Sequence, residues 1–468
     1  MHYLFIILSV YFVTFLDKPE KTAPQLSERA WEQRAKWGIA TDQMDYPVSP
    51  LYMGELTKMG VKIYHKSRWF NGVTCEMDKE LAAKVAELKF VTAVEMTRDD
   101  SKAVAQIRKS QWQKEQTNGP ATDKRKTIDQ LKVYNLLPLH EAGYEGQGIL
   151  MTVCDGGFYN ASQMSCFRPA ALELGHFDFT DDTDDFYGST GTHGTECLST
   201  ISAVEDGYYG AAPKAQYYLM RSEEMYTESP KEMDNLVAAF EKADSLGVNI
   251  FSVSLGYAMF DNASWTLPKS ALDGNSTRAS LAATIAARKG MLVCVAAGNE
   301  GNKEWHTLSV PSDADSILTV GAVRTDSVPG NFSSYGPSAD GRVKPEVCAV
   351  GAGAVVMTPQ GYAISANGTS FATPLIAGMA ACIWSALPNE NAMQIRERII
   401  RSTDRYTTPT DPQYGYGIPN AMVACALPTG LMSVTGNSYP ITHKIVRNGQ
   451  ILIIRGEKTY TITGQVVE

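Results

Sequence analysis

The spacing of hydrophobic residues changes along the chain and marks out its parts. Between residues 11 and 97, the strand-like segment YFVTFLD is followed by helical spacing in LSERAWEQRAKWG and by extended segments around Asn71-Gly72, a hairpin signal. A second helical segment, KELAAKVAELKF, and a closing strand, VTAVEM, complete this region. Ser27 is placed to cap the first helix and Gly38 to end it. This order of elements predicts a small α+β domain.

From residue 128 to residue 427, short and continuously apolar strands alternate with helical segments. The strands are ILMTVCD, AQYYLMRS, VNIFSVSLG, MLVCVAAGN and SILTVGAV, and the helical segments include THGTECLSTISAV, MDNLVAAFEKADSLG and RASLAATIAARKG. Apolar strands separated by helices are typical of a parallel sheet that is covered on both faces. We therefore expect one α/β domain with a central, mostly parallel sheet.

Three further segments lie outside these domains. Residues 1–10, MHYLFIILSV, are apolar but too short to span a membrane, and we interpret them as the remnant of a secretion signal. No other segment approaches the length of a membrane span. Residues 98–127 are polar and charged, which predicts an exposed linker that contains the processing region. Residues 428–468 hold three short β segments with turn residues between them, which predicts a β-hairpin appendage.

Composition and charge exclude several classes of protein. The 468 residues are 44% hydrophobic and 20% charged, as in an ordinary globular protein with a large core. The net charge of -9 argues against a nucleic-acid partner, because the basic run KRK at residues 124–126 is short and is expected to be exposed linker. The eight cysteines form no CxxC pair, which argues against a zinc site and favours buried free thiols. Disulfides stay open for an exported protein.

Polar residues end several of the expected strands. Asp155 ends ILMTVCD, Ser254 ends NIFSVS and Asn299 ends MLVCVAAGN. Ligands of open parallel sheets gather at the carboxyl ends of the strands, so these side chains are expected to share one edge. His193 and Ser370 begin helical segments that could reach the same edge. Taken singly, each of these residues is explained as a turn or cap residue, a position that serine fills well.

Their combination points to nucleophilic catalysis. A serine hydroxyl is a weak nucleophile until a neighbouring imidazole takes its proton, and a carboxylate holds that imidazole in one tautomer. Asp155, His193 and Ser370 are the residue types for these three roles. The side-chain amide of Asn299 and the backbone N–H of Ser370 could stabilise a developing oxyanion. The residues around the serine are small and leave room for a peptide backbone: Gly368, Thr369 and Ala372.

Five motifs in this order resemble those of the subtilisin-like serine peptidases, or subtilases. They are VCDGGF around Asp155, GTHGTECLSTI around His193, SVSLG, AAGNEG around Asn299 and NGTSFATPLIAGMAA around Ser370. The order Asp, His, Ser is also that of the family. The resemblance covers roughly residues 128–427. It implies a three-layer α/β fold, serine endopeptidase activity and polypeptide substrates.

The resemblance also implies a role for single residues. Asp155 and His193 would be charge-relay partners, Ser370 the nucleophile, Asn299 the oxyanion-hole donor, and Ser254, Leu255 and Gly256 the edge strand that pairs with extended substrate. Pro374 resembles the proline inside the family's catalytic helix, and Val310-Pro311 resembles a cis-proline turn near the specificity pocket. In one departure, Asp155-Gly156-Gly157 stands where the family commonly has Asp-Ser/Thr-Gly. The carboxylate is kept, so we expect retained function.

The flanking regions extend the resemblance. Residues 11–97 resemble the inhibitory propeptide of secreted Bacteroidetes subtilases, which implies a ferredoxin-like domain, a zymogen and an intramolecular inhibitor. Residues 428–468 resemble short sorting or anchoring domains of secreted Bacteroidetes proteins, of the type IX secretion kind. We accordingly expect a monomer that is secreted, periplasmic or on the cell surface.

Other functions fit the sequence less well. An α/β-hydrolase needs G-x-S-x-G at its nucleophile, but Ala372 stands at the last glycine, and the order of triad residues differs. A sedolisin-like acidic peptidase would use Glu and Asp beside its serine, which His193 in GTHGTE contradicts. The alternative that stays open is a catalytically silent binding protein on the subtilase fold.

No cofactor or metal is expected. Calcium could bind the acidic run at residues 181–185, Asp181, Asp182, Asp184 and Asp185, but a solvated loop is the preferred interpretation. VGAGAV at residues 350–355 lacks the full fingerprint of a phosphate loop.

Overall fold

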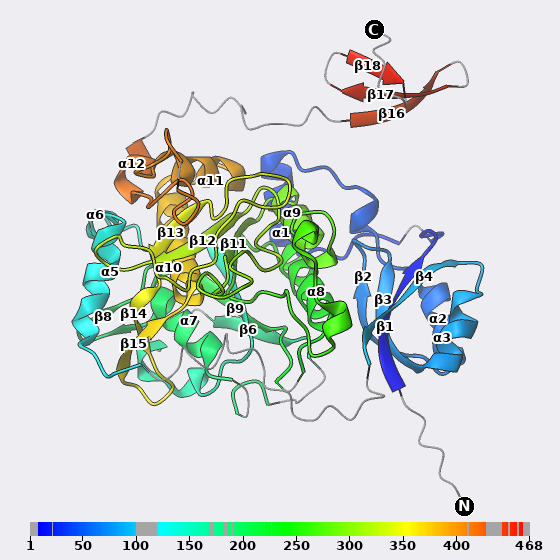
Figure 1. Cartoon of the computed structure of the whole chain (residues 1–468), viewed down its shortest axis with the longest axis horizontal. Coiled ribbons are helices and arrows are strands. Elements are labelled where there is room, and N and C mark those ends of the chain that lie inside the picture. The colour runs from blue at the N-terminus through cyan, green and yellow to red at the C-terminus, as the bar shows by residue number, and fades with distance from the viewer. Residues whose placement is uncertain are drawn as a thin grey trace, which may run out of the picture. The chain divides into compact units, whose positions relative to one another are not determined.

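The structure is a computed structural model of the chain. It describes residues 8–20, 22–99, 119–167, 173–180, 185–188, 191–225, 227–409, 411–426, 442–447, 450–455 and 458–461. The chain divides into two units, Met1–Cys425 and Ala426–Glu468, each of which is described by itself. In the described part of the larger unit, one sheet has four strands, another has seven, and two more have two strands each (Figure 1).

The first sheet is antiparallel and has four strands in the order β2-β3-β1-β4. Its strands are β1 (Leu8–Phe15), β2 (Lys62–Ser67), β3 (Gly72–Asp78) and β4 (Val91–Arg98), and the helices packed on it are α2 (Pro50–Lys58) and α3 (Lys79–Ala86). Apolar side chains from both layers form one core, among them Val13, Val73, Leu56 and Val85. The sheet order and the β-α-β-β-α-β sequence of elements are those of a ferredoxin-like domain, as expected.

Two details of this domain follow from local sequence. Helix α1 (Glu28–Trp37) begins where the Ser27 side chain accepts a hydrogen bond from the Ala30 N–H, and it ends at Gly38 with φ 66°. Both ends are therefore where the sequence placed them. Strand β1 begins at Leu8, before the expected start at Tyr11. The end of the segment interpreted as a signal remnant thus belongs to the sheet.

The second sheet is parallel and has seven strands in the order β13-β12-β11-β10-β5-β9-β6. Its strands are β5 (Leu150–Asp155), β6 (Glu173–Asp178), β9 (Gln216–Arg221), β10 (Ile250–Val253), β11 (Leu292–Ala296), β12 (Leu318–Val323) and β13 (Val347–Val350). Helices cover both faces, which confirms the expected three layers. Along β5, Met151 and Val153 face one core cluster while Leu150 and Cys154 face the other. Burial on both faces explains why the strand reads as continuously apolar.

The helices divide between the two faces. One core cluster includes residues of α7 (His193–Ser202), α10 (Thr369–Ala386) and α11 (Ala392–Arg401), together with α5 (Thr127–Val133), α6 (Leu137–Glu141) and α12 (Ala421–Ala426). The other includes α8 (Lys231–Leu246) and α9 (Arg278–Arg288). Two small antiparallel pairs flank the sheet: β7 (Val204–Glu205) with β8 (Tyr208–Tyr209), and β14 (Ala352–Met357) with β15 (Ala363–Asn367).

Among the described helices, only α10 is long and apolar enough to cross a membrane by composition, and 89% of that stretch is buried inside the protein. Its character is therefore that of a core helix. All eight cysteines are free thiols, and Cys425 alone is not fully buried. The expectation of buried free thiols is confirmed. The smaller unit is an antiparallel sheet of β16 (Thr442–Arg447), β17 (Gln450–Arg455) and β18 (Lys458–Thr461).

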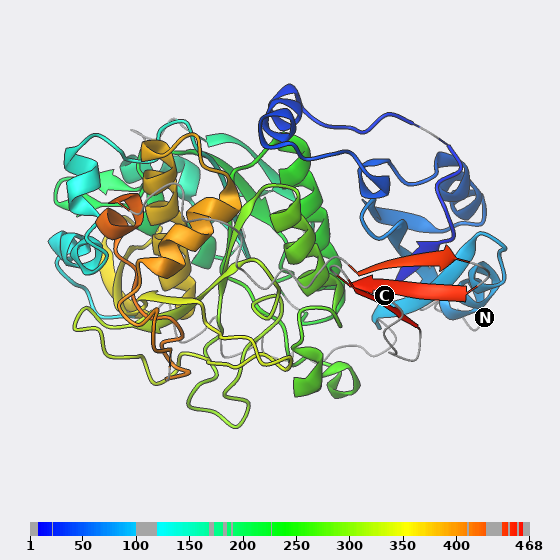
Figure 2. The ribbon, with the colours of Figure 1, turned by 90° about the horizontal axis from the view of Figure 1, so that it is seen from above.

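The ferredoxin-like domain lies against α8, with α2 and α3 on the far side of its sheet (Figures 1 and 2). Glu241 of α8 is central to this contact, because its carboxylate accepts from the Ser67 hydroxyl and from the N–H groups of Arg68 and Trp69. The turn after β2 is thereby fixed to the helix. Burial raises the pKa of Glu241. The charge of Arg68 and these hydrogen bonds lower the pKa by less, so the net shift is upward.

Candidate active site

Asp155 and His193 meet at the carboxyl edge of the parallel sheet. Asp155 is the last residue of β5, and His193 is the first residue of α7. The Nδ1 of His193 lies 2.7 Å from Oδ1 of Asp155, and both side chains are buried. The same carboxylate oxygen accepts the N–H of Gly156 at 2.7 Å. Since a carboxylate can only accept, the imidazole donates from Nδ1, which leaves Nε2 as its basic nitrogen.

Close packing of two segments explains the glycine after His193. A Cβ atom on Gly194 would lie 2.4 Å from the carbonyl oxygen of Gly157 and 2.9 Å from Cβ of Asp155. Any other residue would push the first turn of α7 away from the end of β5. Gly194 is therefore a requirement of the Asp155–His193 contact.

Ser370 lies in the first turn of α10 and is fully buried. Pro374 lies inside the same helix, as expected, and it lacks the N–H that would bond the carbonyl of Ser370. Two side chains donate hydrogen bonds to that carbonyl instead: the hydroxyl of Ser254 at 2.8 Å and the thiol of Cys197 at 3.4 Å. In return, the Ser370 hydroxyl donates to the carbonyl of Ser254 at 3.3 Å. The proline thus couples α10 to the end of β10.

Asn299 has a side chain whose orientation is fixed by α10. Its Oδ1 accepts from the N–H of Thr369 at 2.9 Å and from the Thr369 hydroxyl at 3.1 Å. Because a backbone N–H can only donate, the amide oxygen must face α10 and Nδ2 must point elsewhere. Nδ2 is buried and has no hydrogen-bond partner among the described residues. A buried donor without a partner is costly, so this amide has a hydrogen bond to give to an acceptor from outside the described residues.

Cys197 and Glu196 also border His193, and sequence reasoning missed both. Cys197 lies one helical turn after His193, with Sγ 3.9 Å from each ring nitrogen, and its contact with the Ser370 carbonyl makes it a bridge between α7 and α10. Burial raises the pKa of this thiol to about 11. Burial also raises the pKa of the Glu196 carboxyl, to about 7. The signal was the helical spacing i+3 and i+4 from His193, which places both residues on the side of α7 that carries it.

The candidate substrate-binding segment follows β10. Ser254 and Leu255 are buried, and Gly256 is partly exposed. Tyr257, the next residue, exchanges two backbone hydrogen bonds with Val310, at 2.8 and 2.9 Å. The Val310-Pro311 bond is cis, as the sequence resemblance implied.

Two groups of described residues have donor atoms close enough to hold a metal ion: Asp155 with His193 and Cys197, and Glu223 with Glu228 and Glu232. The first group is accounted for by the Asp155–His193 hydrogen bond. The calcium site considered from the sequence includes Asp181, Asp182 and Asp184, which lie outside the described residues.

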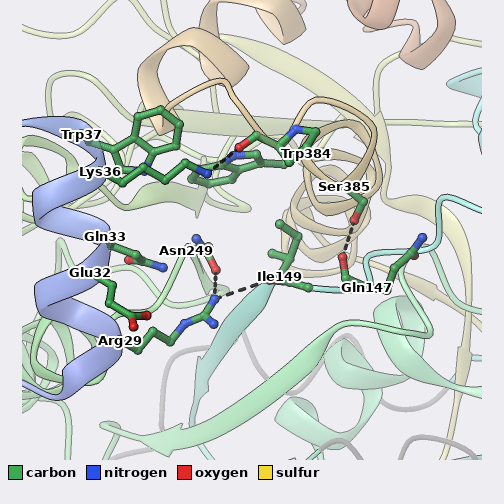
Figure 3. Close-up of a pocket in the computed structure, with 12 residues that line it drawn as sticks. Arg29, Glu32, Gln33, Lys36, Trp37, Gln147, Ile149, Asn249, Trp384 and Ser385 are labelled. Carbon is green, nitrogen blue, oxygen red and sulfur yellow. Dashed lines mark hydrogen bonds between the residues drawn. The ribbon is translucent and has the colours of Figure 1, made fainter.

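A cavity of about 260 Å³ lies between α1 and the parallel-sheet domain (Figure 3). Arg29 spans it and donates to Oδ1 of Asn249 at 2.6 Å, and Lys36 donates to the carbonyl of Pro388 at 2.7 Å. Its lining includes Ile149, at the amino end of β5. Asp155 lies at the opposite end of the same strand, so the cavity belongs to the contact between the domains and not to the edge that carries Asp155.

Comparisons with known proteins divide the chain much as the two large sheets do, into an N-terminal domain and a parallel-sheet domain. Residues 146–417 match the Subtilase family, and residues 10–117 match the Peptidase S8 propeptide domain of Bacteroidota. Subtilisin NAT of Bacillus subtilis subsp. natto is 26% identical over 372 residues, which cover 79% of this chain and 84% of that protein. Subtilisin of Bacillus pumilus is 28% identical over 289 residues, or 61% of this chain and 94% of that protein.

A solved structure agrees with the fold. MycP1 from Mycobacterium smegmatis matches with a TM-score of 0.52 at 19% identity, over 67% of this chain and 90% of that one. At this level of identity the likeness concerns the fold alone.

Proposed function

Because the chain belongs to the subtilase family of serine endopeptidases, we propose that Asp155, His193 and Ser370 cleave peptide bonds through an acyl-enzyme. The observation that carries this proposal is the 2.7 Å hydrogen bond between Asp155 and His193 beside the first turn of α10. Asn299 supports it, since its Nδ2 is held without a partner among the described residues.

In the first half of the reaction, the Ser370 oxygen attacks the carbonyl carbon of the substrate while Nε2 of His193 accepts the hydroxyl proton. Asp155 keeps the imidazole in the right tautomer and stabilises the imidazolium. The carbonyl oxygen becomes an oxyanion, which Nδ2 of Asn299 and the N–H of Ser370 stabilise. When the intermediate collapses, the C–N bond breaks and His193 gives its proton to the leaving amine.

In the second half, water hydrolyses the ester. Nε2 of His193 takes a proton from the water as its oxygen attacks the acyl carbon. The new oxyanion is held by the same donors, and the Ser370 oxygen leaves with the proton of His193. The substrate is proposed to lie extended along Ser254, Leu255 and Gly256.

The ferredoxin-like domain is proposed to keep this site inactive until it is removed. Its match to a peptidase propeptide supports this role. A buried ion network also holds it to the catalytic domain: Arg34 pairs with Asp45 at 2.7 Å and with Asp244 at 2.9 Å, and Lys289 pairs with Asp45 at 2.8 Å. We propose the divisions drawn from the sequence, with a signal remnant at 1–10, a propeptide at 11–97, a linker at 98–127, a catalytic domain at 128–427 and a sorting appendage at 428–468.

The experiment that tests this proposal is the intact mass of purified wild type beside Ser370→Ala. It requires no knowledge of the substrate. If the wild type loses its N-terminal domain and the variant keeps it, Ser370 is a working nucleophile and the propeptide removes itself. If both stay whole, trypsin treatment followed by a casein assay separates an enzyme that awaits another protease from the silent binding protein. Casein hydrolysis by trypsin-treated Ser370→Ala equal to that by wild type would contradict the assignment.

We further propose that the protein is an exported monomer, in the periplasm, on the cell surface or outside the cell. Its propeptide match and its likeness to subtilisins support export. Fractionation of cells that produce the full chain, followed by gel filtration of the purified protein, tests both points.

A further inference from the structure

Residues 119–122 form a third strand on the small sheet of β14 and β15. The N–H of Thr122 donates to the carbonyl of Ala363 at 3.0 Å. In the same register, the carbonyl of Pro120 accepts from the N–H of Ser365 at 3.0 Å. The segment that the sequence predicted to be linker therefore ends in chain that is paired with the parallel-sheet domain.

This strand approaches β15 so closely that Gly119 has no room for a side chain. A Cβ atom there would lie 1.6 Å from the carbonyl oxygen of Ser365 and 2.7 Å from its carbonyl carbon. Further along the strand, Ala121 lies opposite Ile364 in antiparallel register, and Ile364 is buried. Because the close contact is with backbone atoms, which cannot turn aside as a side chain can, only glycine allows the two strands to meet in this way.

The chain that follows the strand is fixed as well. Asp123 caps the short 3₁₀ helix Lys124–Lys126, and its side chain accepts from the N–H of Arg125 at 3.0 Å. Thr127 is 1% exposed, and its hydroxyl accepts from the N–H of Tyr209 in β8 at 3.1 Å. The backbone of the basic run KRK is therefore held at both ends. Proteolysis is favoured where the backbone is free of such bonds, so this turn is a poor place for a cut.

Strand β15 leads directly to the proposed nucleophile. It ends at Asn367, and Ser370 follows in the first turn of α10. Ser365, which bonds Pro120, lies five residues before Ser370 and is at most about 18 Å from it. One edge of β15 pairs with β14 and the other with residues 119–122. Since a two-stranded sheet is marginal by itself, the third strand helps to fix the residues that set the position of Ser370.

We propose that residues 119–127 stay with the catalytic domain when the propeptide is removed and that they act as a positioning strand for Ser370. This inference rests on the proposed peptidase function. The catalytic domain then begins at Gly119 and not at residue 128, and the bond that is cut lies on the N-terminal side of Gly119. Hydrolysis of that bond consumes one water and leaves a carboxylate on the propeptide and an amine on the catalytic domain. The propeptide match ends at residue 117, which supports this boundary.

The boundary is tested by the N-terminal sequence of the catalytic domain after processing. We expect the first residue to be Gly119 or an earlier one. A variant that combines Lys124→Gln, Arg125→Gln and Lys126→Gln should be processed at the same bond as wild type. A cut within or after the KRK run, or loss of processing in the combined variant, would overturn the boundary.

A second readout of the boundary needs no peptidase activity. The full-length Ser370→Ala chain is treated briefly with trypsin, and the products are identified by intact mass. Because the KRK run is held in a capped turn, residues 119–127 should stay joined to the catalytic domain while the chain is cut elsewhere. Release of residues 119–124 by trypsin would show that the strand is not held and would contradict the proposal.

The positioning role is tested with Thr122→Pro, which removes the N–H that bonds Ala363. One backbone hydrogen bond is typically worth about fivefold in an equilibrium constant, so we expect the kcat of the processed enzyme to fall by about fivefold, with KM unchanged within about twofold. Ala121→Pro is the matched control, because successive N–H groups of an antiparallel strand face opposite ways and that of Ala121 points away from β15. Thr122→Val keeps the N–H and should restore the kcat of wild type.

Labelling of Ser370 by phenylmethanesulfonyl fluoride separates positioning from stability. Its rate should fall with kcat in Thr122→Pro, since both depend on where the hydroxyl lies. A lower Tm with unchanged kcat and labelling, or an equal loss of kcat in the two proline variants, would mean that the strand does not position Ser370. A wild type that cuts no peptide would instead contradict the peptidase proposal, and the trypsin products of Ser370→Ala would still decide the boundary.

Discussion

Asn299 shows how one backbone group can orient the side chain of a proposed oxyanion donor. The N–H of Thr369 fixes the amide oxygen, and the other end of the amide is left without a partner among the described residues. The donor that the proposed oxyanion needs is thus in place before substrate binds. Such preorganisation costs no rearrangement during the reaction, which is why it accelerates the chemical step.

Replacement of Asn299 by alanine should lower kcat with little effect on KM. Loss of one oxyanion donor typically costs about a hundredfold to a thousandfold in kcat, a range established on subtilisin itself. The control is Asn302→Ala, an exposed residue of the same turn, which should retain wild-type kinetics. An Asn299→Ala enzyme with unchanged kcat would mean that another group holds the oxyanion.

Activity should fall as the solution is acidified, because the proposed base must be neutral. Burial by itself would lower the pKa of His193, but the charge of Asp155 outweighs it and holds the pKa well above its usual value. The rate should therefore rise as pH increases through this raised pKa. The contribution of the Asp155–His193 ion pair to fold stability changes in the opposite direction to the rate. It is present at low pH, where His193 is charged, and is lost as pH rises through the folded-state pKa. A profile of kcat/KM from about pH 5 to pH 9 measures this, and a flat profile would exclude His193 as the base.

At the scale of elements, helix α1 extends the contact of the propeptide beyond its sheet. This helix lies apart from the four strands of the propeptide sheet. It reaches the end of α8, where the N–H of Ser27 donates to the carbonyl of Ser245 at 2.8 Å. Arg34 then enters a buried ion network with Asp45 and Asp244. The propeptide is therefore held at a place distant in sequence from its C-terminal strand, and cutting the linker leaves these contacts intact.

Arg34→Ala should destabilise the full chain, measured in the Ser370→Ala background so that the propeptide is retained. Removing one partner of a buried ion pair leaves the other charges uncompensated and costs about 3 kcal/mol. The free energy of unfolding in urea measures this loss. Lys58→Ala is the matched control, because its pair with Glu55 lies on the surface of the same domain and should contribute less than about 1 kcal/mol. Equal losses in both variants would show that the α1 network does not anchor the propeptide.

At the scale of the whole molecule, the boundary between the two units falls at the end of α12, between Cys425 and Ala426. Ala421 and Ala424 of this helix are buried, and the carbonyl of Ala424 accepts from Arg398 of α11 at 3.0 Å. Helix α12 therefore packs into the core of the parallel-sheet domain. Residues beyond it form a unit of their own.

A chain that ends at Ala426 should keep the Tm and the peptidase activity of the full chain. The reason is that residues 1–425 form one unit with its own cores. A chain that ends at Asn420 should lose stability, because it removes the buried side of α12 and leaves Arg398 without the Ala424 carbonyl. Thermal unfolding of the two truncated chains makes the comparison. A large loss on removing the appendage alone would show that it supports the catalytic unit.

The sequence by itself determined the features that depend on neighbouring residues. Continuous apolar runs such as LMTVCD indicated strands buried on both faces, and Ser27 and Gly38 marked the ends of α1. Their signals are local, because strand burial, caps and turns depend on a few adjacent side chains. Local signals also placed Asp155 at the end of β5, and His193 and Ser370 in the first turns of α7 and α10. Topology alone then brings such positions to one edge of a parallel sheet.

Only the tertiary structure decided which distant groups meet. Nothing near Pro374 in the sequence shows that Ser254 would bond the carbonyl that this proline leaves free. The buried network of Arg34 with Asp244, and the pairing of Arg98 with Glu224, join residues more than a hundred positions apart. In the sequence these residues read as ordinary surface charges of helices and loops. Packing of one domain on another removes their water and decides their partners, and that step has no local signal.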